Sequence, residues 1–86
     1  MNLLYLESLS GLDRITRYLE NNEIDFLKRE SSFFVLTERS SETFLRNLRG
    51  FLYLYNDNDS RLNIKVSPLL NDNFSKEEFL ILKSSF

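Results

Sequence analysis

Two strand-like runs separated by a helix-cap signal constrain the fold of this chain more than any other feature. FFVLTE, residues 33–38, is rich in aromatic and β-branched side chains, and RLNIKVS, residues 61–67, alternates apolar with polar side chains. Both patterns are typical of strands with one buried face. Between the runs, Ser40 or Ser41 is placed to cap the N-terminus of a helix. The second half of the chain is therefore expected to contain a strand, a helix and a strand.

The first half carries comparable signals. Residues 3–7 form a short apolar run with an aromatic, which predicts a first strand. Ser10, followed by Asp13 at the capping-box spacing, predicts a helix over residues 11–21, which ends at asparagines that tolerate a left-handed conformation. EIDFLKRE, residues 23–30, alternates as a strand does and is joined to FFVLTE by a serine turn. These segments predict a strand, a helix and a hairpin.

Gly50 decides where the second helix is predicted to end. Glycine is favoured just beyond a helix C-terminus, so we expect the helix to stop near Arg49. FLYLY, residues 51–55, then precedes a dense Asn/Asp turn and predicts a strand that forms a hairpin with residues 61–67. The alternative is a longer helix, because apolar side chains over residues 48–55 also keep helical spacing.

The C-terminal segment leaves two structures open. Pro68 is expected to end the preceding strand or an edge of the sheet, because proline cannot donate a hydrogen bond to a sheet. Ser75 and Glu78 have the spacing of a capping box, which predicts a short helix after them. The same apolar residues would also serve as a final strand.

The predicted order is strand, helix, strand, strand, helix, strand. Two right-handed βαβ units in one antiparallel sheet, with two helices on one face, give the ferredoxin-like βαββαβ fold of the α+β class. We expect this domain to cover residues 1–68, and residues 69–86 to form a short C-terminal extension that packs on it. The chain has 86 residues, which suffice for one domain.

Three segments of this order resemble one known family. LYLESL, residues 4–9, is similar to its first-strand motif of apolar, aromatic and apolar residues followed by Asn-Leu. FFVLTE with SSETFLRNLRG resembles its third strand entering the second helix, and SRLNIKVS resembles its last strand. Over residues 3–67 the chain therefore resembles an RNA recognition motif (RRM), in a non-standard form.

The resemblance implies a module of RNA processing that binds single-stranded RNA on its sheet. Bases stack on exposed rings for about 1–3 kcal/mol each, while basic side chains follow the phosphates. Tyr5 and Phe34 stand at the ring positions of the first and third strands. The nearby cations are Lys28, Arg29 and Lys65. Acidic and serine residues replace the basic residue, the glycine and the first aromatic of the third-strand signature, so we expect weak binding.

A protein-interaction module is the alternative. Some RRM variants hold a peptide with an Arg-x-Phe loop after the second helix and an acidic first helix. Arg49 and Phe51 match that tripeptide, and Asp13 and Glu20 lie on the predicted first helix. Self-association into a homodimer through FLYLY, residues 51–55, as an exposed edge strand is a further alternative.

Composition excludes several function classes. The chain has no Cys and no His, which removes disulfides, thiolate zinc sites, cysteine nucleophiles and the commonest general base. NDNDS, residues 56–60, lacks the glycine and glutamate positions of a calcium loop and predicts a turn. No apolar run approaches the roughly 18 residues of a membrane span. We therefore expect an intracellular, non-catalytic protein, nuclear or cytoplasmic, without a metal, a cofactor or a membrane partner.

Overall fold

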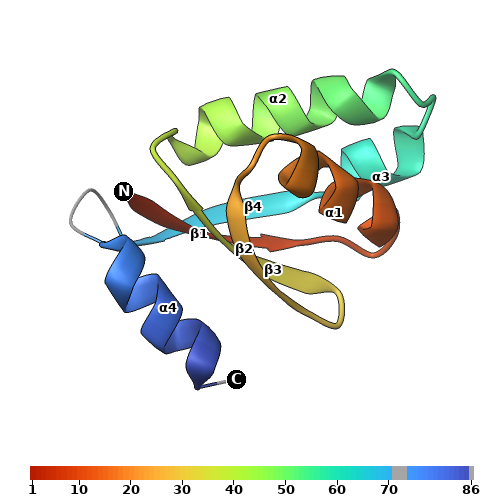
Figure 1. The fold of residues 1–86 in the computed structure, drawn as a ribbon. Coiled ribbons are helices and arrows are strands. Elements are labelled where there is room, and N and C mark those ends of the chain that lie inside the picture. The colour runs from red at the N-terminus through yellow and green to blue at the C-terminus, as the bar shows by residue number, and fades with distance from the viewer. Residues whose placement is uncertain (71–73, 86) are drawn as a thin grey trace.

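A four-stranded antiparallel sheet and four helices make up the part of the chain that the computed structural model describes, residues 1–70 and 74–85 (Figure 1). In chain order the elements are β1 (Asn2–Glu7), α1 (Leu12–Asn21), β2 (Asp25–Arg29), β3 (Ser32–Thr37), α2 (Ser41–Tyr53), α3 (Asn58–Asn63), β4 (Lys65–Leu70) and α4 (Lys76–Ser84). Within the described ranges, no helix combines the length and the apolar character needed to cross a membrane.

The sheet has the order β2-β3-β1-β4, and every neighbouring pair is antiparallel. In the register of the pairs, Tyr5 lies opposite Phe34 on one side and Ser67 on the other. Leu27 of β2 lies opposite Phe34. Because residues directly opposite each other in a sheet share a face, one row of four side chains crosses the whole sheet at this level.

The main core lies between the sheet and α1 and α2. Every second residue of β1 and β3 points into it, because successive side chains of a strand point to opposite faces of the sheet. α1 and α2 contribute the buried stripes that their helical spacing predicts. Its fully or almost fully buried members are Leu4, Leu6, Ile15, Tyr18, Leu19, Phe33, Val35, Phe44, Leu48, Leu52 and Ile64. Burial of each such aliphatic or aromatic side chain contributes about 1.5–3 kcal/mol. Burial also raises the pKa of the Tyr18 phenol, and the Arg39 guanidinium beside it lowers that pKa part of the way.

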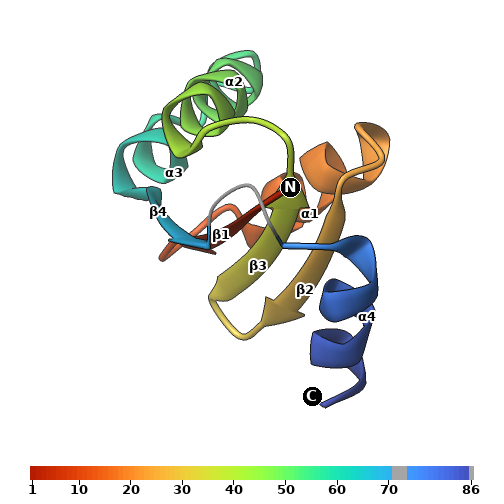
Figure 2. The same cartoon turned by 90° about the vertical axis from the view of Figure 1, so that its left-hand side faces the viewer.

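α4 packs against the opposite face of the sheet (Figure 2). Phe79, which is 1 % exposed, contacts Leu3 of β1 and Leu36 of β3, and Phe74 and Leu82 pack around them. The helix begins at a full capping box between Ser75 and Glu78. The helical alternative for the C-terminal segment is therefore confirmed, and the final-strand alternative is wrong.

The predicted end of α2 at Gly50 is wrong. The helix begins as predicted, with Ser40 as its N-cap, but it continues through Gly50 to Tyr53. Leu52 explains the difference, because it is fully buried and continues the apolar stripe of α2 by one more turn. The C-cap is Leu54, and the chain then turns at Asn56, whose φ of 55° is left-handed.

The predicted hairpin between residues 51–55 and 61–67 is wrong for the same reason. Residues 51–53 are helical, and the second segment starts inside α3, so β4 begins only at Lys65. Self-association through a FLYLY edge strand therefore has no structural basis. The helical face of the sheet carries α1, α2 and α3, where two helices were expected (Figure 1).

α1 begins at Leu12 with Gly11 as its N-cap, so the predicted cap at Ser10 is wrong. Gly11 is the N-cap residue with φ +70°, and no side chain caps this helix. The Ser10 hydroxyl is instead hydrogen-bonded to the Ser60 hydroxyl, at 3.0 Å between the oxygens. At the other end, Asn22 is not left-handed, and Glu23 takes the positive φ of 54°.

Pro68 lies inside β4 and does not end it. It is opposite Leu4, and the strand continues to Leu70 past a register shift between Leu3 and Leu4. β4 is an edge strand, where proline is tolerated.

Candidate functional site

An aromatic pair lies on the sheet face that carries α4. The rings of Tyr5 and Phe34 have centroids 5.4 Å apart at an interplanar angle of 59°. Both side chains are half-buried. The Tyr5 hydroxyl donates a hydrogen bond to Glu7 Oε2 at 3.4 Å, which directs the ring along β1. The two predicted ring positions are thus neighbours on one surface.

α4 covers one part of this face. Phe34 packs against the cluster around Phe79, together with Leu27 of β2. Tyr5 extends the aromatic surface from Phe34 toward β4, where Ser67 is exposed. The part of the face beside β1 and β4 therefore remains accessible.

Two of the three predicted cations flank the pair. In the strand register Arg29 lies opposite Ser32 and Lys65 lies opposite Glu7. Both cations are therefore on the face of Tyr5. A shallow hollow of about 310 Å³ is lined by Tyr5, Arg29, Glu30, Ser32 and Phe34. Glu7 and Glu30 add negative charge at the same level, so the face has a mixed charge.

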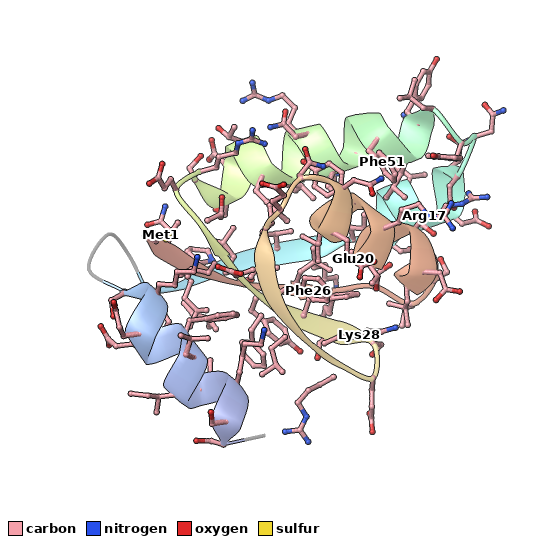
Figure 3. The ribbon with its side chains drawn as sticks, in the orientation of Figure 1. Met1, Arg17, Glu20, Phe26, Lys28 and Phe51 are labelled. Atoms are coloured by element: carbon pink, nitrogen blue, oxygen red, sulfur yellow. The ribbon has the colours of Figure 1, made fainter. Side chains whose placement is uncertain are left out.

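Lys28 lies on the other face. Its ammonium nitrogen is 6.0 Å from the centroid of the Phe33 ring, which belongs to the main core. Its side chain extends toward α1 and lines a hollow there with Asp13 and Arg14 (Figure 3). The structure therefore does not bring Lys28 together with Tyr5.

The predicted peptide-binding residues do not assemble into one pocket. Arg49 and Phe51 are helical, so the predicted Arg-x-Phe loop is wrong. Phe51 is directed from α2 toward α1, and its ring centroid lies 5.2 Å from that of Tyr18 and 5.1 Å from that of Tyr55 (Figure 3). Arg49, by contrast, is exposed on α2. Asp13 and Glu20 are exposed on α1.

A polar junction between α1 and α3 was missed by the sequence analysis. Arg14 Nη1 lies 3.1 Å from Asp57 Oδ2, and the Ser60 amide donates to Asp57 Oδ1 at 3.1 Å. Ser60 is buried and also meets the Ser10 hydroxyl. A Cβ on Gly11 would collide with Ser60 Oγ. We call these five residues the α1–α3 junction; the signal for it was Asp57 at capping distance from Ser60.

The α1–α3 junction changes the acidity of its carboxylate. Desolvation raises the pKa of Asp57, but the hydrogen bonds from Ser60 and the positive charge of Arg14 outweigh it. The net result is a pKa below the usual value of an aspartate, so the charged form is favoured in the folded protein. The junction is a structural site that fixes α3.

Among the residues that the structure describes, no group of three or more acidic side chains is arranged to hold a metal ion. Comparisons with protein-family models, curated proteins and solved structures find no match to this chain.

Proposed function

We propose that this chain is a non-catalytic, RRM-like binding module with the ferredoxin-like arrangement, and that it binds single-stranded RNA weakly on the open part of its sheet. The strand order β2-β3-β1-β4 with antiparallel neighbours supports the arrangement, as do α1 and α2 on one face. The resemblance of the first and third strands to the family supports the function.

The adjoining rings of Tyr5 and Phe34 carry this proposal. A base can stack on a half-exposed ring, and the positive charges of Arg29 and Lys65 attract the phosphates on either side. Two stacked bases contribute about 2–6 kcal/mol, which corresponds to dissociation constants around the millimolar range. The carboxylate of Glu7 opposes the phosphates, so weak binding is expected.

Titration of the ¹⁵N-labelled protein with oligouridylate, followed by NMR, tests the proposal. We expect the largest shifts at Tyr5 and Phe34, and we expect Tyr5→Ala to abolish them without unfolding the domain. Lys65→Glu should weaken binding about two- to fivefold. Lys28→Glu is the matched control, because the same charge change on the α1 side should leave binding unchanged. Shifts that avoid Tyr5, or equal effects of the two lysine variants, would refute the proposal.

A further inference from the structure

Gly50 lies in the middle of an exposed surface of α2, where the fold does not require a glycine. Its backbone is helical, and a Cβ added to it would meet no atom within 4 Å. Glycine lowers the stability of a helix interior relative to alanine. Gly11 differs, because its positive φ and the nearby Ser60 both exclude a side chain. One physical use of a glycine at such a position is close approach by another molecule to the helix backbone.

A hollow of about 470 Å³ adjoins this position. It is lined by Arg49, Gly50, Tyr53, Arg61 and Leu62, which come from α2 and α3. Tyr53 is 61 % exposed and Leu62 is 71 % exposed, so apolar surface is presented directly to solvent. The hollow thus lies beside a residue without a side chain, Gly50, and is bounded by an aromatic residue, Tyr53, and an aliphatic residue, Leu62.

Arginine side chains are held around the hollow. Arg49 Nε donates to the Arg61 carbonyl oxygen at 3.2 Å, and Arg61 Nη2 donates to Asn58 Oδ1 at 3.1 Å. The Arg61 guanidinium lies over the Tyr53 ring, 5.2 Å from its centroid. Arg46 is exposed one turn before Gly50 on the same side of α2. Arg46 and Arg49 are both exposed, and a guanidinium matches a carboxylate in shape and charge.

We propose that this surface binds an acidic segment of a partner protein that carries a large apolar side chain. Carboxylates of the segment pair with the arginines, and its apolar side chain lies against Tyr53 and Leu62. Its main chain approaches α2 at Gly50. We call this the Gly50 surface, and it consists of Arg46, Arg49, Gly50, Tyr53, Arg61 and Leu62.

The exposed apolar residue favours a peptide over a nucleic acid. A phosphate backbone would use the arginines and could stack a base on Tyr53, but it would gain little from Leu62. The formal net charge of −2 also opposes a long polyanion, whereas a short segment responds to the local arginines. α2 and the open part of the sheet lie on opposite sides of the molecule, so this site is independent of the proposed RNA site (Figures 1 and 2).

The test is an NMR titration of the ¹⁵N-labelled chain with synthetic peptides. The probes are an oligoglutamate, the same peptide with two central leucines, and an oligolysine of equal length as the control. We expect saturable shifts confined to the Gly50 surface, with the leucine-containing peptide binding severalfold tighter than oligoglutamate. Oligolysine should cause no shifts there. Oligouridylate is titrated separately, and shifts at the Gly50 surface with oligouridylate but not with the peptides would overturn the proposal in favour of nucleic acid.

Variants separate recognition from folding. Arg46→Glu should weaken peptide binding about two- to fivefold, whereas Arg17→Glu, the same exchange at an exposed position of α1, should not. The side chain introduced by Gly50→Leu should keep the peptide main chain away from α2 and so abolish the preference for the leucine-containing peptide. The NMR signals of core residues should stay unchanged. Equal losses in the two arginine variants, or unaltered binding by Gly50→Leu, would refute the proposal.

Discussion

Replacement of Gly50 by alanine should stabilise the protein. α2 continues through this position with exposed backbone, and the added methyl group meets no atom within 4 Å. Alanine is favoured over glycine in a helix interior by about 0.8–1.0 kcal/mol, and the more restricted unfolded chain accounts for much of that difference. We therefore expect Gly50→Ala to raise the free energy of unfolding by about 0.5–1 kcal/mol.

Urea denaturation followed by circular dichroism measures this change, and thermal melts provide a second readout. For a domain of this size the gain corresponds to a rise in Tm of about 2–8 °C. The slope of unfolding free energy against urea concentration should stay the same, because the compactness of both states is unchanged.

Gly11→Ala is the matched comparison, since it makes the same chemical change at the other glycine of the chain. There the backbone has φ +70° and the new methyl group would collide with Ser60 Oγ. The left-handed conformation and the disturbed Ser10–Ser60 hydrogen bond together should lower the free energy of unfolding by about 2–3 kcal/mol. A loss of stability in Gly50→Ala comparable to that in Gly11→Ala would refute the argument, because it would indicate a left-handed glycine at the end of α2.

Two further contacts, at the start of α3 and beneath α4, can be tested by substitution. Asp57→Ala should lower the free energy of unfolding by about 1–2 kcal/mol at neutral pH through loss of the α3 cap. Because the pKa of Asp57 is lower in the folded than in the unfolded protein, the difference between Asp57→Ala and wild type should shrink in urea titrations as the pH falls below about 4; a constant difference would contradict the pKa direction. Phe79→Ala should remove amide-exchange protection selectively from α4, whereas Leu80→Ala, at an exposed position, should change stability by less than about 0.5 kcal/mol. Protection in α4 that survives Phe79→Ala would mean that other contacts hold the helix.

Three of the four strands and the starts of two helices could be predicted from local signals. β1 and β3 follow their apolar, aromatic-containing runs, and β2 follows the alternation of its residues. Ser40 and Ser75 cap α2 and α4 at the expected places. These elements are governed by interactions between residues that are close in sequence. Local patterns were sufficient for them.

The end of α2 could not be predicted in this way, because local signals conflict there. Gly50 favours an end, whereas Leu52 continues the apolar stripe, and only the core decides between them. α3 is similar, since six residues are too few to form a stable helix alone. Its order depends on Arg14 and Ser10, which are distant in sequence.

The candidate site was predicted in part. The rings of Tyr5 and Phe34 are neighbours, as expected from two adjacent strands. Lys28 was grouped with them, although strand alternation places it with Phe26, on the α1 side. The Gly50 surface was not anticipated, because it exists only if α2 passes through Gly50 and α3 follows.

The α1–α3 junction also has a consequence for folding. The Ser10–Ser60 contact joins residues fifty positions apart, and bringing such distant points together costs chain entropy that nearby contacts avoid. The hairpin of β2 and β3 and the docking of α1 need no such closure. We therefore expect the segment that leads into β4 to become ordered after the N-terminal half, and the last strand to complete the sheet late in folding.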